Sequence, residues 1–323
     1  MNLGAYLLKR VFYSVPLLVG AIVVIFSLIH AAPGDPTDYI IGDASVSQEF
    51  IDRLRAEMGL DQPLYVQLAK YILEVFSGNF GFSYIRNTPV IDLILDRLPA
   101  TLLLMSTQYL LSIAVGIYLG VISAQRPNSR LDRSITVFSL AAFAVPLFWL
   151  GQMLILGLAY HLDWFPIQGM TNIREGYSGW RHALDVAHHL ALPVLTLALP
   201  NIALVLRLMR SSMLEVVGQE YIKVARAKGL SERTVLFKHA MRNALLPVVT
   251  VVSLGLPTLI AGAVLTETVF AWPGLGRLTF DAINARDYPL LMGMFLFISL
   301  VVIIGNLIAD ALYALLDPRI RYQ

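Results

Sequence analysis

The sequence predicts an all-α polytopic membrane protein with six transmembrane helices. Of its 323 residues, 57% are hydrophobic and only 14% are charged, whereas a soluble domain carries about a quarter charged residues. A bilayer core about 30 Å thick needs about 20 consecutive apolar residues in a helix. The apolar runs are continuous rather than alternating, which excludes a β-barrel. The six predicted spans lie near Val11–Ala31, Thr101–Ala124, Ser134–Leu158, Leu190–Met213, Ala244–Thr266 and Pro289–Leu315.

The first span has some features of a secretory signal peptide. Its apolar region is longer than the usual 7 to 15 or so residues, and Pro33 follows the small residues that a cleavage site would need. We interpret it as a retained anchor, which makes residues 1–32 an N-terminal anchor span.

Residues 33–99 are predicted to form an external helical insert. Ser47 can cap a helix that runs to Met58, and Asp61 can cap a second helix that runs to Phe76. Both predicted helices carry an apolar stripe, which favours packing on the mouth of the bundle over a ligand role. The remaining residues, 100–323, form a predicted core of five spans.

The positions of the positive charges predict the orientation of the spans. Short cytoplasmic loops retain Lys and Arg, and an N-terminus inside places most of the 24 such residues on the cytoplasmic side. They gather at Arg126–Arg133 and in the polar loop 214–243. Both termini and this loop are therefore predicted to be cytoplasmic.

The loop 214–243 is built like a rigid, charged knob. Gln219–Lys228 makes about three helical turns, and Gly229 supplies the left-handed residue that ends a helix. Ser231 can cap a second helix, whose first turn holds Glu232, a favourable charge at a helix N-terminus. This loop is expected to meet a partner outside the bilayer.

One face of the first helix in this loop is narrow. Tyr221, Val224, Ala225 and Lys228 follow the spacing i, i+3, i+4, i+7, so they could lie together in a groove of a partner protein. The same helix could instead rest on the membrane, with its basic residues facing anionic lipid. The physics of the helix leaves both interpretations open.

Ionisable residues inside spans need an explanation, because each costs about 2.5–3.5 kcal/mol at the centre of a bilayer. Arg207 and Arg210 are one turn apart in the fourth span, and Asn306 and Asp310 are at i and i+4 in the sixth. An ion pair between these helices, snorkelling of the arginines and a proton relay are the alternatives. A relay usually needs more carboxylates or histidines within the bundle.

Two external segments carry weaker signals. His182, Asp185 and His189 would share one helix face and could reach a common ion, but solvated polar residues explain the same spacing, so we predict no metal site. The turn Trp272–Pro273–Gly274 could form part of an external gate, or it could be a tight interfacial turn with an aromatic anchor.

Catalytic motifs are missing from the sequence. The chain has no cysteine, which excludes disulfides, thiolate metal sites and cysteine nucleophiles. HExxH, GxSxG and GxxxxGK[ST] are also absent. We therefore predict that the chain is not an enzyme and holds no cofactor, so any nucleotide that drives it binds another chain.

Several motifs resemble one family along nearly the whole chain. In the loop, ARAKGLSE at 225–232 followed by KHAMRNALLPVVT at 238–250 resembles the dipeptide and oligopeptide permease subfamily of ABC importers. Lys223 and Arg242 depart from the general importer motif, which has glutamate and proline there, but such departures are normal in this subfamily. Other similar segments are Ala32–Pro36, Gly59–Pro63, Ser77–Ser83, Thr266–Arg277 and Leu316–Arg321.

The resemblance implies a type I ABC importer permease fold in a bacterial inner membrane, with peptides or a similar small solute as cargo. The subunit would pair with a homologous second permease, with two cytoplasmic P-loop ATPases that hold ATP and Mg, and with an external solute-binding protein; no nucleic acid is implied. The implied ATPase-coupling helix comprises Glu220, Tyr221, Val224, Ala225, Arg226, Ala227, Lys228 and Gly229. A self-sufficient secondary transporter or channel is the alternative, although the sequence shows neither an internal repeat nor a buried carboxylate cluster.

Overall fold

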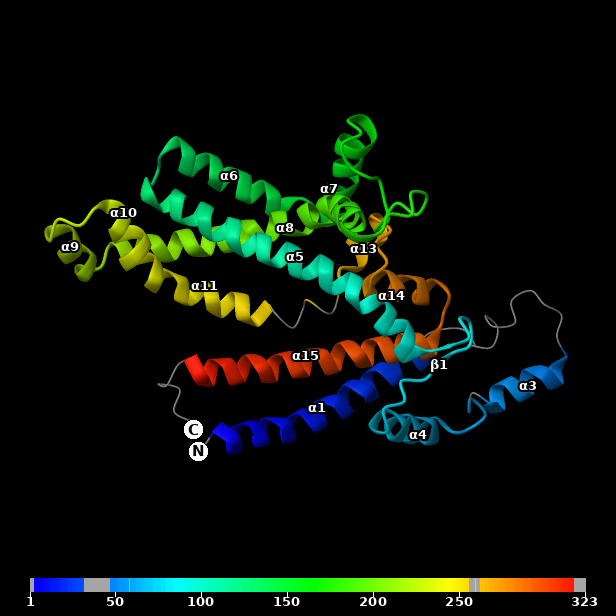
Figure 1. Ribbon diagram of the computed structural model, residues 1–323. Helices are drawn as coiled ribbons and strands as arrows, with labels where there is room; N and C mark the ends of the chain where they lie inside the picture. The colour runs from blue at the N-terminus through cyan, green and yellow to red at the C-terminus, as the bar shows by residue number, and fades with distance from the viewer. Residues whose placement is uncertain (1–2, 32–46, 58, 256–258, 260–261, 317–323) are drawn as a thin grey trace. The chain divides into compact units, whose positions relative to one another are not determined.

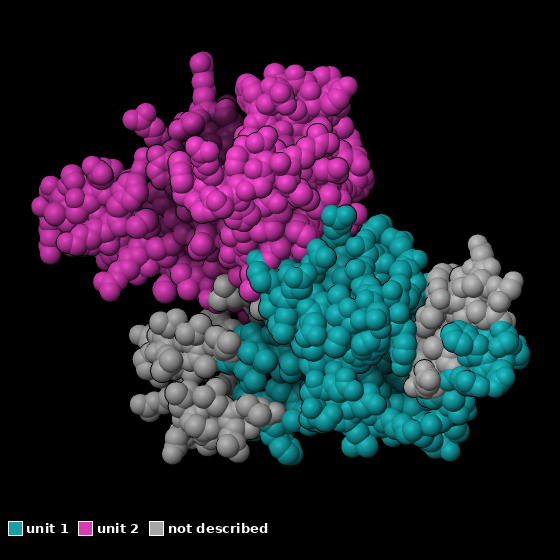
Figure 2. All heavy atoms as spheres, turned by 45° about the vertical axis from the view of Figure 1, so that its right-hand side comes forward, with its two compact units in different colours: residues 1–99, 274–323 teal, residues 100–273 magenta. Residues whose placement is uncertain are grey.

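In the part of the chain that the structure describes, the regular structure is helical apart from one short hairpin (Figure 1). The computed structural model describes residues 3–31, 47–57, 59–255, 259 and 262–316. The motif Ala32–Pro36 and nearly all of Leu316–Arg321 lie outside these residues. The chain divides into two compact units, residues 1–99 with 274–323 (unit 1) and residues 100–273 (unit 2), which Figure 2 colours separately. The predicted boundaries at residues 32 and 99 separate an external insert from the membrane spans. The two compact units do not test these boundaries, so they stay a prediction.

The described residues contain five helices that are long and apolar enough to cross a membrane. A sixth span is present if the bent pair Arg130–Ala144 and Leu147–His161 is counted as one. The expectation of a helical bundle with about six spans is therefore confirmed. The five helices are Phe12–Ala31, Val90–Gln125, Gly179–Val217, Glu232–Gly255 and Tyr288–Leu307.

Unit 1 is built on two long helices that lie side by side, α1 (Leu3–Ala31) and α15 (Tyr288–Leu316) (Figure 1). Helix α4 (Leu64–Phe76) packs on α1, and α14 (Leu275–Asn284) packs on α15. The unit also holds α3 (Gln48–Glu57) and a hairpin of β1 (Phe82–Ser83) and β2 (Thr88–Pro89). The described part of the predicted insert thus contains two complete helices, as expected, a hairpin that was not predicted, and the first turns of the helix that starts at Val90.

The start of α4 differs from the prediction. Ser47 does accept a hydrogen bond from the Phe50 N–H, at 3.3 Å, as expected of a cap for α3. Asp61, however, does not cap α4, because the extended residue before the first turn is Pro63. Proline has no N–H to satisfy, and its carbonyl accepts the N–H groups of Val66 and Gln67, at 2.8 and 3.2 Å.

A buried polar contact ties the hairpin to the start of α15. The Ser83 hydroxyl donates to the carboxylate of Asp287, and both residues are buried. Asp287 also caps α15 by accepting the Leu290 N–H at 3.2 Å. Burial raises the pKa of the Asp287 carboxyl above its ordinary value. Asp287 therefore fixes the end of a span and the hairpin with one side chain.

Unit 2 contains two helices that are longer than a bilayer is thick. Helix α5 (Val90–Gln125, whose first turns belong to unit 1) has 36 residues and α8 (Gly179–Val217) has 39, which correspond to about 54 and 58 Å. The predicted spans missed the first turns of α5 and both ends of α8. Polar flanking turns lowered the hydropathy there but did not break the helices.

Helices α5 and α8 approach closely at two glycines. A Cβ added at Gly116 would lie 2.6 Å from the Cβ of Val205, and one added at Gly120 would lie 2.8 Å from the Leu206 carbonyl oxygen. The spacing Gly-x-x-x-Gly places both on one face, as in packed transmembrane helices. The glycine spacing in the sequence carries this signal, although the contact was not among the predictions.

The third predicted span is broken. Helix α6 (Arg130–Ala144) is followed, at a bend of 106°, by α7 (Leu147–Leu154) and the π-helical segment η1 (Ile155–His161). Pro146 causes the break, since it lacks an N–H and forces the residue before it out of the helical region. Val145 accordingly has φ −81° and ψ 129°.

The fifth predicted span, Ala244–Thr266, is interrupted as well. Helix α11 (Met241–Gly255) ends within the predicted span, and α13 (Val264–Val269) begins only after Gly262, which has φ +77°, and the non-helical Ala263. Residues 256–258 and 260–261 lie outside the described residues. The prediction of one continuous helix was therefore wrong, because a left-handed glycine cannot continue an α-helix.

We predict that the α5–α8 contact does not tolerate a methyl group. Gly120→Ala should destabilise the protein by about 1–3 kcal/mol, because the new Cβ meets a backbone oxygen that cannot rotate away. Gly20→Ala in α1 is the matched control, since no atom lies within 4 Å of its added Cβ. Thermal unfolding of the detergent-purified variants measures the difference, and equal midpoints for the two would contradict the packing described.

Candidate functional site: a surface helix with a buried anchor

The helix predicted in the polar loop is present with nearly the predicted ends. Helix α9 spans Glu220–Ala227, with Gln219 and Lys228 as the flanking caps. Gly229 follows in the left-handed region at φ +75°, and its N–H bonds the Arg226 carbonyl at 2.9 Å. Glycine alone adopts this φ without steric cost. The loop therefore turns sharply at Gly229, as the sequence indicated.

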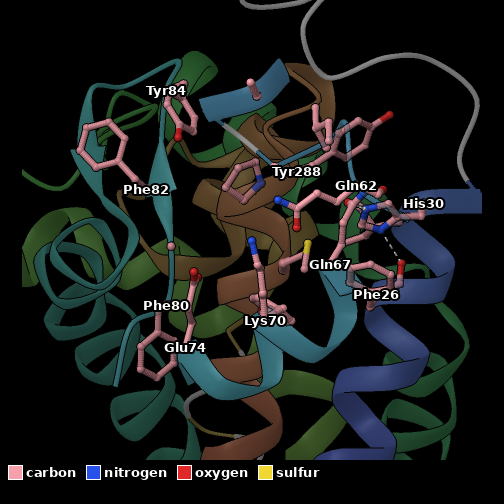
Figure 3. A pocket seen from close by; sticks show the side chains of 18 residues that line it. Phe26, His30, Gln62, Gln67, Lys70, Glu74, Phe80, Phe82, Tyr84 and Tyr288 are labelled. Carbon is pink, nitrogen blue, oxygen red and sulfur yellow. Dashed lines mark hydrogen bonds between the residues drawn. The ribbon is translucent and has the colours of Figure 1, made fainter. Parts of the chain in front are cut away.

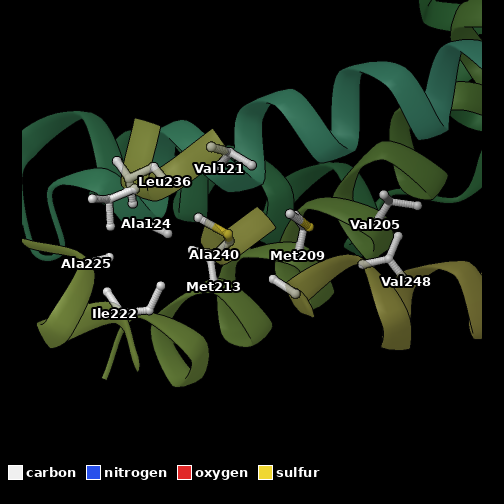
Figure 4. Packing of buried hydrophobic residues seen from close by; sticks show 12 residues of the cluster. Val121, Ala124, Val205, Met209, Met213, Ile222, Ala225, Leu236, Ala240 and Val248 are labelled. Atoms are coloured by element: carbon white, nitrogen blue, oxygen red, sulfur yellow. The ribbon is translucent and has the colours of Figure 1, made fainter. Parts of the chain in front are cut away.

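One side of α9 is buried in the core of unit 2. Ile222 is 0% exposed and Ala225 is 7% exposed, and both belong to a cluster formed with α5, α8, the π-helical segment η2 (Val235–Ala240) and α11 (Figure 4). We call this the anchor cluster. Its buried members are Val121, Ala124, Val205, Met209, Met213, Ile222, Ala225, Val235, Leu236, Ala240, Ala244 and Val248.

The other side of α9 is exposed. Tyr221 and Val224 are 41% and 53% exposed, large values for apolar side chains, and Ala227 and Lys228 are exposed as well. The predicted face included Ala225 among these residues, but Ala225 points to the anchor cluster instead. The reason is helical geometry, because Ala225 lies at i+3 from the fully buried Ile222.

Three of the charged side chains of α9 form ion pairs within the loop. Arg226 donates two hydrogen bonds to Glu232, at 2.6 and 3.1 Å, and Lys223 pairs with Glu220 at 2.7 Å. The hydrogen bonds to Glu232 raise the pKa of the Arg226 guanidinium above its ordinary value. Such exposed pairs contribute at most about 1 kcal/mol. The Arg226–Glu232 pair closes the turn around Gly229, a contact that sequence analysis did not foresee.

The segment that leads from the loop back into the next span also contacts α9. Ser231 caps α10 (Glu232–Thr234) by accepting the Thr234 N–H at 3.4 Å, as predicted. The chain then runs through η2 into α11, where the amide nitrogen of Asn243 donates to the Tyr221 hydroxyl at 2.6 Å. The tyrosine predicted to face a partner is thus also oriented by a side chain of α11.

An ion pair joins α6 to α8 in the same unit. Arg210 donates two hydrogen bonds to Asp132, at 2.7 and 2.8 Å, and Asp132 also accepts from Ser123 and from the Asn128 N–H. The partners predicted for Arg210 were Asn306 and Asp310 instead. The side chain of Asp310 lies outside the described residues. Asp132 was overlooked because it follows the apolar run of the second span rather than lying within one.

The predicted gate turn contains a fully buried tryptophan. Trp272 is 0% exposed, packs with residues of α5 and α8, and donates its indole N–H to the Ala100 carbonyl at 2.9 Å. Trp272 therefore holds this turn by burial within unit 2, and the two interpretations of the turn, as a gate or as an interfacial turn, stay predictions. Nearby, the buried carboxylate of Glu267 accepts from the Thr101 hydroxyl at 3.0 Å.

The predicted histidine face lies on α8. His189 contacts Asp185 at 3.2 Å, and the second carboxylate oxygen of Asp185 accepts the Asn172 N–H at 2.7 Å. Among residues 3–31, 47–57, 59–255, 259 and 262–316, no group of three His, Cys, Asp or Glu could hold a metal ion. Asp185 therefore fastens the preceding loop to α8.

Comparison with protein families gives two matches that together cover most of the chain. A family model described as binding-protein-dependent transport system inner membrane component matches residues 116–322. A model of the N-terminal part of such membrane components matches residues 3–105.

Similar proteins extend over the full length. The oligopeptide transport system permease protein AppB of Bacillus subtilis is 44% identical, covering 99% of this chain and 100% of that protein. The dipeptide transport system permease protein DppB of Escherichia coli K12 is 38% identical over 98% and 99%. A solved structure of the MetNI methionine ABC transporter, in inward-facing conformations, is similar in fold, with a TM-score of 0.54 and 16% identity over 70% of this chain and 97% of that one.

We predict different roles for the two sides of α9 in stability. Ile222→Ala should cost about 2–5 kcal/mol, because it leaves a cavity in the anchor cluster. Val224→Ala, two residues further on and therefore on the opposite, exposed side of α9 (53% exposed), should change stability by less than about 0.5 kcal/mol. Denaturant unfolding in detergent compares them, and equal losses would show that α9 is not anchored as described.

Proposed function

The chain belongs to the family of binding-protein-dependent transport system inner membrane components, and from that premise we propose that it forms half of the translocation pathway of an importer for short peptides. Family membership makes it a multi-pass permease subunit of an ABC importer in a bacterial inner membrane. ATP hydrolysis therefore belongs to separate ATPase subunits, and a binding protein is a general partner of this family.

The two-sided character of α9 supports a role in coupling. Its exposed side presents Tyr221 and Val224, and its buried side is fixed in the anchor cluster. A helix that only rested on lipid headgroups would place its apolar residues towards the bilayer and would need no core contacts. We propose that an ATPase subunit receives the exposed side in a groove.

The anchor cluster explains how force would reach the membrane. Because Ile222 and Ala225 pack against α5, α8 and α11, a displaced α9 must either move with these helices or lose its buried apolar contacts. ATP-driven closure of the ATPases would therefore tilt the spans, provided that the ATPases bind the two conformations with different affinity. In this proposal α9 is the lever and the cluster is its attachment.

The charge contacts can be divided between two residues. Arg226 is held by Glu232, so it stiffens the turn at Gly229. Lys228 has no ion-pair partner among the described residues, and we propose it as the cation that meets an acidic group of the ATPase. Glu220, Ala227 and the flanking backbone would complete the fit.

The assembly would contain two permeases and two ATPases. Each permease of this kind offers one coupling helix, so two ATPases require a second, homologous permease.

We also propose that Pro273 and Gly274 form part of the external gate, with Trp272 as the buried anchor of that turn. The predicted positions of the termini and of α9 in the cytoplasm belong to the same proposal.

The cargo proposal rests on the relatives. Those at 38–44% identity are named as oligopeptide and dipeptide permease proteins, so we propose short peptides. Reconstitution of this chain with its partner permease, ATPases and binding protein in liposomes tests this. ATP-dependent uptake of labelled Ala-Phe should require all components, whereas uptake by this chain alone would contradict the proposal and favour a self-sufficient carrier.

We predict that Gly229 is needed for coupling through its backbone conformation. Gly229→Val should uncouple ATP hydrolysis from uptake, because a β-branched residue is strained at φ +75° even though open space surrounds the position. Gly229→Asn is the matched control, since asparagine tolerates this region and should retain coupling. Normal peptide-stimulated ATPase activity and uptake in Gly229→Val would refute the role assigned to the turn.

A further inference from the structure

Unit 1 contains a cavity that the transport proposal does not use. Its volume is about 420 Å³, within the range of small-molecule sites. It is open on one side and is lined by the end of α1, the end of α3 with the turn after it, the face of α4, the hairpin segment and the start of α15 (Figure 3). It therefore lies where the predicted external insert meets two spans.

Two polar atoms that line this cavity are buried without a hydrogen-bond partner among the described residues. They are the Oε1 of Gln62 and the hydroxyl oxygen of Tyr71. The neighbouring Gln67 side chain does have partners: its nitrogen donates to the backbone carbonyl oxygen of Gln62 at 2.8 Å, and its oxygen lies 3.3 Å from Nε2 of His30. Buried polar atoms normally have partners, so two orphans in one cavity point to a ligand with a donor and an acceptor.

Opposite charges and aromatic walls line the same cavity. Lys70 and Glu74, one helical turn apart on α4, both line it (Figure 3) and have no ion-pair partner among the described residues. Burial, followed by the charge of Glu74, raises the pKa of Tyr71, which keeps its hydroxyl protonated and able to donate. The apolar part of the wall includes Phe26, Phe80, Phe82 and Tyr288.

We propose that this cavity binds a small zwitterion that carries an apolar group. Its ammonium group would meet Gln62 Oε1 and Glu74, its anionic oxygens would meet Lys70 and the Tyr71 hydroxyl, and its apolar group would pack on the aromatic wall. A short peptide has this chemistry, and so does the headgroup region of an ethanolamine phospholipid. The peptide source rests on the proposed function, whereas the site itself does not.

Direct binding to the complete permease–ATPase complex tests the site. The complex, without binding protein, is placed in phosphatidylglycerol nanodiscs, and labelled Ala-Phe is titrated by equilibrium dialysis. We expect saturable binding of Ala-Phe and none of its N-acetylated, C-amidated form. In nanodiscs that contain phosphatidylethanolamine, native mass spectrometry of the released complex counts retained lipid, which distinguishes the second source.

Variants of α4 separate a ligand role from a structural one. Tyr71→Phe should weaken binding of the zwitterion roughly tenfold and leave the unfolding temperature unchanged or raised, because it removes an unpaired buried hydroxyl. Lys70→Gln should weaken binding as well. Tyr65→Phe, on the same helix but 75% exposed and outside the cavity, should bind like the wild type.

The outcomes are decisive in either direction. Binding of Ala-Phe or retention of phosphatidylethanolamine that Tyr71→Phe reduces supports the site and identifies its ligand. Binding of neither zwitterion, or binding that Tyr71→Phe and Lys70→Gln leave unchanged, overturns it. Peptide uptake by the full transporter is measured in parallel, so normal uptake with no binding here rejects this inference alone, whereas absent uptake rejects the proposed function.

Discussion

The burial of Ile222 and Ala225 in the anchor cluster is the interaction on which the rest depends. Full burial of an isoleucine side chain contributes about 1.5–3 kcal/mol, more than the exposed Arg226–Glu232 pair can supply. Apolar packing therefore decides which helices α9 moves with, while the ion pair only shapes the turn. Without this anchor, α9 would be a surface helix that a partner could shift with no effect on the spans.

Within the spans, close packing and paired polar groups take over the role that apolar burial has in the loop. Lipid is as apolar as a leucine side chain, so helices associate through van der Waals contact and internal hydrogen bonds. Gly116 and Gly120 supply the contact between α5 and α8. Asp132 with Arg210, and Glu267 with Thr101, supply the polar links. These contacts hold together the helices on which the residues of the anchor cluster lie.

The sequence predicted the features that depend on local physics and not those that depend on packing. The apolar runs gave the span count, and Gly229 and Ser231 gave the ends of the loop helices. Pro146 is a local signal for a helix break. The prediction missed it because the apolar run continues on both sides of the proline. The burial of Ala225 and of Trp272, and the Asp132–Arg210 pair, depend on which helices become neighbours, so no local pattern carried them. The cavity in unit 1 joins segments more than 200 residues apart for the same reason.

Site-directed cross-linking in the assembled transporter tests the central claim most directly. The chain has no cysteine, so a single one can be introduced at Val224 on the exposed side of α9, or at Ile222 on the buried side. Its thiol is then modified with a short thiol-directed reagent that carries a photoactivatable group, which needs no cysteine on the neighbouring subunit. If α9 docks as described, Val224→Cys cross-links to an ATPase subunit and the link changes with bound ATP, whereas Ile222→Cys does not react. Reaction at Ile222→Cys, or no ATPase adduct at Val224→Cys, would contradict the account.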